Sequence, residues 1–167
     1  IRKTEQLLVA AVQLMRRGGS AGLEQAKQAL LLAAELTPGD ARVIDGLGCV
    51  AWRQKRYALA DDYFYRARAL DPSYARAYAH LALAAQERGS IKEAQILLVR
   101  SLELSPLDYQ TRNNYAALLA QRGTDRELLQ QALSELRKAM LSAPGHEPLL
   151  RRNLERLENA EGLNASH

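Results

Sequence analysis

The residues that most often carry out catalysis or bind metals are few in this sequence and show no recognisable arrangement. The three histidines have no spacing typical of metal ligands, and the sequence holds no HExxH motif. The single cysteine, Cys49, excludes an intrachain disulfide and a cysteine-cluster zinc site, and we expect an inert thiol there. Asp61 and Asp62 are adjacent on an expected helix, where their side chains point in different directions. We therefore expect no catalysis and no metal or other cofactor.

The composition indicates a helical protein with enough apolar residues to form a core. Of 167 residues, 47% are hydrophobic, which argues against global disorder. Leu occurs 30 times and Ala 28 times, whereas Val, Ile and Thr together occur 13 times, too few for a sheet protein. We therefore expect the positioning of any functional residue to depend on helices.

The charge pattern, the apolar runs and the start of the chain limit the partners and compartments that we expect. The net charge is +4, but the basic residues are dispersed and no basic run exceeds two, so we expect solvated helix faces and no nucleic acid. No apolar run reaches about 18 residues, which excludes a membrane-spanning helix. Because the chain begins at Ile1 without a leader pattern, we expect a fragment or a processed product. The sequence leaves two alternatives for its compartment, which are the bacterial periplasm or cell envelope and the cytoplasm.

An internal repeat organises the sequence. Four prolines stand at positions 38, 72, 106 and 144. The intervals between them are 34, 34 and 38 residues. Fixed residue types occupy the twelfth, eighth, fifth and fifteenth positions before each proline. The four columns are Ala26, Ala60, Ala94 and Ala132; Leu30, Phe64, Leu98 and Leu136; Ala33, Ala67, Ser101 and Ala139; and Leu23, Tyr57, Ile91 and Leu129. A fixed period of this length is typical of stacked helical repeats.

The first half of each unit repeats as well, and the whole pattern resembles the tetratricopeptide repeat family. A large residue stands beside a small one at Leu47-Gly48, Leu81-Ala82 and Tyr115-Ala116. The family has a 34-residue unit of two antiparallel helices with such a pair, an alanine and a closing proline. The match covers nearly the whole chain. It departs from the family pattern in a fourth unit that is four residues longer, near positions 124–128, and at Arg112, where an aromatic residue is expected.

The resemblance implies an all-α fold, a right-handed α-solenoid of about four helix hairpins with a capping helix at the C-terminal end. We expect one domain over 1–160, with repeats at about 2–38, 41–74, 75–108 and 109–144. The first helices of the hairpins are predicted at 2–17, 40–54, 74–88 and 108–122. The second helices are predicted at 21–36, 57–70, 91–104 and 126–142. The capping helix is predicted at 147–160, followed by a flexible tail at 161–167.

The family register places a partner-binding groove along the first helices. The implied groove residues are Arg42, Asp45, Cys49, Trp52, Arg53, Arg76, Leu83, Gln86, Gln110, Asn113 and Gln121. Asn113 is the best candidate for an amide that binds a peptide backbone. Trp52 is interpreted either as an aromatic anchor or as packing against the preceding helix. The arginines could attract an acidic partner, whereas the paired lysines and asparagines of a chaperone-type carboxylate clamp are missing.

The implied function is a non-catalytic protein–protein interaction scaffold that binds a partner peptide or protein in its concave groove. The resemblance suggests an assembly factor of a larger bacterial multi-protein machine, such as a pilus, secretion or polysaccharide-export system. The alternative is a nucleic-acid-binding helical repeat, which would need aromatic residues or arginines at fixed repeat positions. Self-association is compatible with the scaffold hypothesis.

Overall fold

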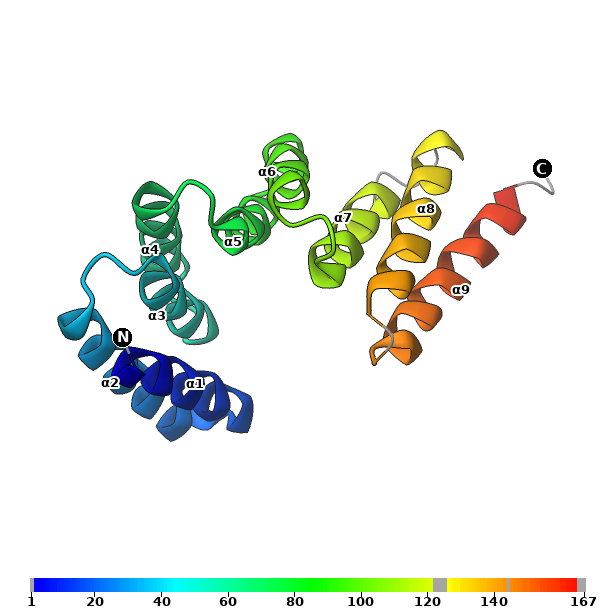
Figure 1. Cartoon of the computed structure of the whole chain (residues 1–167). Helices are drawn as coiled ribbons and strands as arrows, with labels where there is room; N and C mark the ends of the chain where they lie inside the picture. Colours follow the sequence, from blue (N-terminus) through cyan, green and yellow to red (C-terminus); the bar gives the residue numbers. More distant parts are fainter. Residues whose placement is uncertain (1, 122–125, 144, 165–167) are drawn as a thin grey trace. The chain divides into compact units, whose positions relative to one another are not determined.

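The computed structural model describes residues 2–121, 126–143 and 145–164. Over these ranges the chain forms nine α-helices (Figure 1). They are α1 (Arg2–Arg17), α2 (Gly19–Leu36), α3 (Ala41–Arg53), α4 (Tyr57–Leu70), α5 (Ala75–Glu87), α6 (Ile91–Leu104), α7 (Tyr109–Gln121), α8 (Arg126–Ser142) and α9 (Glu147–Asn164). In this described part, no helix is both long enough and apolar enough to cross a membrane.

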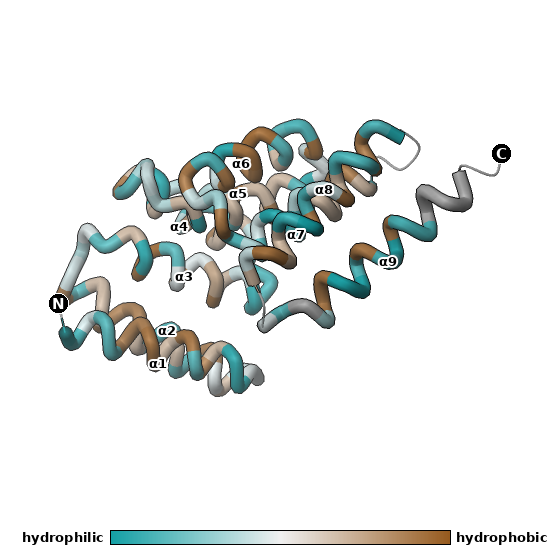
Figure 2. Tube along the Cα trace, turned by 45° about the vertical axis from the view of Figure 1, so that its right-hand side comes forward, coloured by the Kyte–Doolittle hydropathy of each residue, from teal (hydrophilic) through white to brown (hydrophobic). Residues whose placement is uncertain are grey.

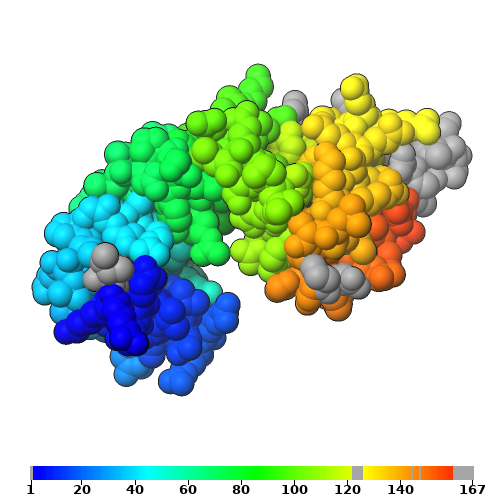
Figure 3. Space-filling model, in the orientation of Figure 1, coloured from blue at the N-terminus to red at the C-terminus, as the bar shows by residue number. Residues whose placement is uncertain are grey.

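The chain divides into two compact units, unit 1 at residues 1–84 and unit 2 at residues 85–167. In unit 1, α1 packs on α2, α3 packs on α4, and α2 also contacts α3. In unit 2, α8 contacts both α7 and α9, and α6 contacts α7. Figure 3 shows the side chains of α9 lying directly against those of α8. Within each unit, a hairpin therefore packs against a neighbouring helix along the chain, as stacked repeats require.

Three of the four repeat columns form the core of every hairpin. The alanines at the twelfth position before each proline are fully buried, and the large residues at the eighth position are at most 2% exposed. The small residues at the fifth position, including Ser101, are also fully buried. The column at the fifteenth position is less regular, because Leu129 is buried whereas Tyr57 is 46% exposed. That column lies in the first turn of each second helix, at the edge of the packed surface.

Small residues allow the helices of a hairpin to approach closely. A Cβ atom built on Gly48 of α3 would lie 2.4 Å from Cε1 of Phe64 on α4, which is closer than real side chains come. Ala82 and Ala116, which hold the same place in the next two repeats, are fully buried. Figure 2 shows apolar and polar segments alternating along the helices, as expected when one face of each helix is packed.

The observed helix bounds differ from the predicted ranges by at most one residue at either end, except in α2 and α9. α2 begins at Gly19, two residues earlier than predicted, so that the glycine-rich stretch joins the helix instead of forming a loop. α9 continues to Asn164, four residues beyond the predicted end of the capping helix, and the sequence holds no helix-breaking proline there. The predicted insertion near 124–128 lies partly outside the described residues, and so do residues 165–167 of the predicted tail.

Candidate ligand-binding site

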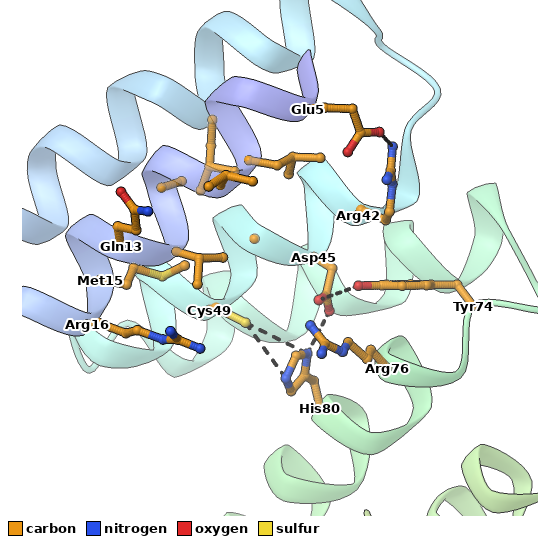
Figure 4. Close-up of a pocket in the computed structure, with 16 residues that line it drawn as sticks. Glu5, Gln13, Met15, Arg16, Arg42, Asp45, Cys49, Tyr74, Arg76 and His80 are labelled. Atoms are coloured by element: carbon orange, nitrogen blue, oxygen red, sulfur yellow. Dashed lines mark hydrogen bonds and ion pairs between the residues drawn. The ribbon is translucent and has the colours of Figure 1, made fainter. Parts of the chain in front are cut away.

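A cavity of about 560 Å³ opens between α1, α3 and the beginning of α5 in unit 1 (Figure 4). One wall is apolar and comes from α1, where Val9 and Val12 are 57% and 42% exposed. The opposite wall carries polar side chains from α3 and α5, among them Asp45, Cys49 and His80. The cavity therefore combines exposed aliphatic surface with groups that can form hydrogen bonds or bind a cation.

The polar wall follows from helix geometry and from the repeat. Asp45 and Cys49 are four positions apart on α3, so their side chains share one face of the helix. His80 lies on α5, the first helix of the next repeat, and is separated from Asp45 by one repeat plus one position. Because equivalent helices of neighbouring repeats lie side by side, this separation brings the imidazole opposite the carboxylate.

Asp45 is the centre of a buried polar cluster. Its Oδ1 atom lies 2.7 Å from Nδ1 of His80, and its Oδ2 atom accepts a hydrogen bond of 3.2 Å from the hydroxyl of Tyr74. The side chain of Asp45 is 5% exposed, whereas that of His80 is 26% exposed. The sequence predicts Asp45 as a groove-facing residue; in the structure it lines the cavity, and hydrogen bonds to two neighbours keep its carboxylate almost fully buried.

The surroundings of His80 favour its charged form. Burial alone would lower the pKa of the imidazole, but interactions with Cys49 and Asp45, including hydrogen bonds, outweigh burial and raise the pKa well above its usual value. For Tyr74, burial is the main cause of a raised pKa, and the negative charge of Asp45 adds to it. The Tyr74 hydroxyl therefore stays protonated and acts as a donor to Asp45.

Cys49, His80 and Asp45 together offer a thiol, an imidazole and a carboxylate. The Sγ atom of Cys49 lies 3.8 Å from both ring nitrogens of His80, a hydrogen-bond distance for sulfur. Because Sγ is equally far from both nitrogens, it is not directed specifically at Nε2, as the thiol of a catalytic triad would be. One possible ligand atom from each lies within 4.8 Å of the others, so these residues could hold a metal ion.

Two other predicted groove residues of unit 1, Arg42 and Arg53, already have partners within the protein. Arg42 pairs with Glu5 at 2.7 Å and with Asp40 at 2.6 Å. Arg53 donates a hydrogen bond of 2.6 Å to the carbonyl of Met15 at the C-terminal end of α1, which also accepts from the backbone N–H of Gly18. These two arginines line the walls of cavities, but their guanidinium groups serve the fold.

Trp52 packs on the second helix of its own hairpin. Its ring meets that of Tyr57 edge to face, with centroids 4.9 Å apart. Trp52 also lines a smaller cavity of about 310 Å³, next to Phe64 and His80. The sequence offered packing against the preceding helix as one interpretation of Trp52; in the structure its ring contacts the following helix α4 instead, and the residue also lines this cavity.

Two predicted groove residues of unit 2 line a different cavity, of about 400 Å³, between α7, α8 and α9. Asn113 and Gln121 line it together with Asn153 of α9. The amide of Asn153 donates a hydrogen bond of 2.7 Å to Oδ1 of Asn113, so this oxygen is occupied by the capping helix. The remaining predicted residues, Leu83, Gln86 and Gln110, do not line either of these cavities of the described chain.

Sequence reasoning did not find His80, Tyr74 or the apolar wall of α1. The separation of Asp45 and His80 by one repeat plus one position is the signal that could have revealed the pair. The α1 wall carried no such signal, because the first unit matches the repeat only in its second helix.

No protein-family model and no curated protein matches the sequence. Among solved structures, Pseudomonas aeruginosa PilF has a TM-score of 0.78 at 21% identity, over 96% of this chain and 69% of its own. YrrB, a TPR protein with an unusual peptide-binding site, has a TM-score of 0.61 at 25% identity, over 92% of this chain and 75% of its own.

A third structure is the first TPR of Spaghetti (RPAP3), bound to the HSP90 peptide SRMEEVD. It has a TM-score of 0.62 at 20% identity, over 70% of this chain and 93% of its own. Some similar proteins are much longer, and the chain spans only 26% of a Thermobaculum terrenum O-GlcNAc transferase mutant. The buried repeat columns and these likenesses together show that the chain has the all-α fold of the tetratricopeptide-repeat proteins.

Proposed function

We propose that the chain is a non-catalytic protein-interaction scaffold that binds an extended segment of a partner protein in the cavity of unit 1. The observation that carries the proposal is the pairing of the two cavity walls. Val9 and Val12 expose aliphatic surface on α1, and hydrogen-bonding side chains face them from α3 and α5. An extended peptide offers groups that match both walls: apolar side chains for the aliphatic wall and backbone amides for the hydrogen-bonding wall.

Two of the similar structures support a peptide as the ligand. YrrB has a peptide-binding site, and the first TPR of RPAP3 was solved with a bound peptide. Their likeness to this chain extends over 92% and 70% of its length. The same fold therefore supports peptide binding in other proteins, although the contacts in this chain must come from its own residues.

The charges around the cavity favour an acidic segment. Arg16 and Arg76 line the cavity and are exposed. Arg42 contributes little, because Glu5 and Asp40 already neutralise it, and His80 is paired with Asp45 in the same way. A carboxylate of the partner would gain most from Arg76, which lies on the polar wall (Figure 4).

The proposal is tested by capturing partners on the immobilised chain and comparing two variants with two matched controls. Val12→Glu and Arg76→Glu place negative charge on the two walls. Ile96→Glu and Arg151→Glu make comparable changes at exposed positions of unit 2 that do not line the cavity. We expect a specific partner to be lost by the first pair and retained by the second. Equal binding of that partner to all four variants would show that this cavity is not the binding site.

The narrower form of the proposal is an assembly role in a bacterial multi-protein machine. The likeness to Pseudomonas aeruginosa PilF, which extends over 96% of this chain, supports it. The identity of the captured partner decides this point. A component of a pilus, secretion or polysaccharide-export system is the expected result, and a partner from an unrelated process would leave only the general scaffold.

A further inference from the structure

We propose that Asp45, Cys49 and His80 form a binding site for a divalent transition-metal ion of the zinc type. The site lies in unit 1 and opens into the cavity of Figure 4. The proposal does not depend on peptide binding, because it rests on the chemistry and mutual distances of three side chains. It reverses the expectation from the sequence that the chain binds no metal.

The three donors come from two helices and converge without any change in the backbone. Asp45 and Cys49 project from one face of α3, and His80 reaches them from α5. The atoms that would bind the ion all lie within 4.8 Å of one another. Convergence of a carboxylate, a thiol and an imidazole is a more specific arrangement than a cluster of acidic residues or a single cysteine.

The Asp45–His80 and Cys49–His80 distances lie on either side of the ligand separations in a tetrahedral zinc site. Zinc–ligand bonds of about 2.0–2.3 Å separate nitrogen, oxygen and sulfur ligands from one another by about 3.4–3.6 Å. The Sγ atom of Cys49 lies 3.8 Å from His80, which needs only a slight closure. The His80 and Asp45 atoms, now 2.7 Å apart in a hydrogen bond, would separate as the ion replaces the shared proton.

The donor types select the metal. Thiolate and imidazole favour zinc, cobalt and copper, whereas calcium and magnesium prefer oxygen ligands alone. A thiolate and a carboxylate carry two negative charges, which balance a divalent cation. Arg76 is the nearest opposing charge on the cavity wall, but it is exposed, so solvent and salt screen it from the site.

Tyr74 would orient the carboxylate ligand. Its hydroxyl donates to Oδ2 of Asp45, which leaves Oδ1 directed towards His80. Hydrogen bonds of this kind to a ligand typically change metal affinity by about 10–100-fold when they are removed. Because three protein ligands leave one tetrahedral position for another group, and the site lines the cavity, the fourth position faces the cavity.

Cobalt titration of the full chain tests the site directly. The protein is purified without an affinity tag, kept reduced, and titrated with Co²⁺ while the absorption spectrum is recorded. We expect one equivalent of Co²⁺ to produce the near-ultraviolet thiolate-to-cobalt band and the intense visible bands of a tetrahedral site, and Zn²⁺ to abolish both. A spectrum of hexahydrated cobalt alone, even at excess metal, would overturn the proposal.

Substitutions identify the ligands. Cys49→Ser should abolish the thiolate band, and His80→Gln should weaken binding by at least about tenfold. Tyr74→Phe should keep the thiolate band and weaken binding by about 10–100-fold. His146→Gln is the matched control, since His146 stacks on Tyr109 in unit 2. Circular dichroism confirms that each variant is folded. Unchanged cobalt affinity in folded Cys49→Ser would exclude this site.

Discussion

Tyr78 and Arg112 hold the same position in successive repeats and make the same hydrogen bond. The hydroxyl of Tyr78 donates to the carbonyl of Pro72, and Nε of Arg112 donates to the carbonyl of Pro106, each over 2.9 Å. Both acceptors belong to the proline that closes the preceding repeat. The arginine that departs from the family pattern therefore preserves the contact that the aromatic residue makes.

The replacement at Arg112 has a counterpart on α8. Arg112 pairs with Glu135, which is 8% exposed, and Lys138 adds a second cation at 2.8 Å from the same carboxylate. Glu135 stands at the ninth position before its proline, where the preceding repeat has the buried Leu97. An ion pair thus occupies the two positions that hold an aromatic and an aliphatic residue one repeat earlier.

This exchange predicts compensation between two substitutions. Arg112→Tyr alone removes the main partner of a buried carboxylate, and Glu135→Leu alone leaves a buried guanidinium unpaired. Each should lower the free energy of unfolding by roughly 1–3 kcal/mol, less than a fully buried pair would, because Lys138 and solvent remain. The double variant restores the pattern of the preceding repeat and should be close to wild type in urea denaturation. Additive losses in the double variant would contradict the proposed compensation.

A second compensation is predicted inside unit 1. Gly48 lies against the large ring of Phe64, whereas the later repeats have alanine and leucine at the two matching positions. Gly48→Ala should therefore overpack the hairpin and cost about 1–2 kcal/mol, the gain in helix propensity offsetting part of the strain. Adding Phe64→Leu should restore most of the loss, as measured by thermal unfolding.

The control for this prediction is Gly39→Ala, where a Cβ atom would meet no neighbour within 4 Å. We expect it to change stability by no more than about 0.5 kcal/mol. If Phe64→Leu made Gly48→Ala less stable still, the two positions would not share the space that the structure indicates.

The sequence was sufficient to predict the fold because the contacts that form the core recur with the period of the chain. Ala26, Ala60, Ala94 and Ala132 are all fully buried, and each makes the same type of close helix contact. Small residues that recur with one fixed period therefore indicate where the two helices of each hairpin pack against each other. The helix bounds follow from the same columns, which explains their agreement to within one residue over most of the chain.

The site could not be predicted in the same way, because it depends on residues outside the repeated columns. Asp45 has Ala79 and Asn113 at the same position of the next repeats, so the period gives no information about the carboxylate. Its burial depends on Tyr74 and His80, which come from beyond its own hairpin and occur once. The register placed Asp45 and Cys49 on the correct face but could not show which side chains would meet them.

A pH dependence is predicted for Asp40, which begins α3. A side-chain hydrogen bond from Arg42 is the main reason that the pKa of Asp40 is lowered from its ordinary value of 3.8, and the backbone N–H of Arg42 adds to it. Because the carboxyl group binds its proton more weakly in the folded state, its contribution to stability is present above about pH 4 and is lost as the pH falls through the lower, folded value.

Asp40→Asn isolates this contribution, because asparagine caps a helix about as well as aspartate but carries no charge. Above pH 4 the variant should be less stable than wild type by up to about 1 kcal/mol, and the two should converge in more acidic solution. Urea denaturation across this range measures the difference. Asp62→Asn is the control, since Asp62 is 61% exposed and its partner Arg66 lies 3.8 Å away. A gap that persists unchanged in acid would rule out the charge as its cause.

The last prediction compares Asp45 with Asn113, which hold the same position of the second and fourth repeats. Each hydrogen-bonds a side chain on a following helix, His80 in unit 1 and Asn153 in unit 2. Asp45 also accepts from Tyr74, and its side chain is 5% exposed, so removing the carboxylate takes the acceptor from two donors.

Alanine at the two positions should therefore have unequal effects. Asp45→Ala leaves two donors without their acceptor and should lower the free energy of unfolding by about 2–3 kcal/mol. Asn113→Ala, at a half-buried site, should lower it by about 0.5–1.5 kcal/mol. Both are measured by urea denaturation with a chelator present, so that bound metal does not contribute. Asp45→Asn should fall between them, since an amide can still accept from Tyr74 or His80. Equal losses at Asp45 and Asn113 would mean that the buried cluster contributes no more to stability than the amide pair, and that burial of Asp45 has another cause.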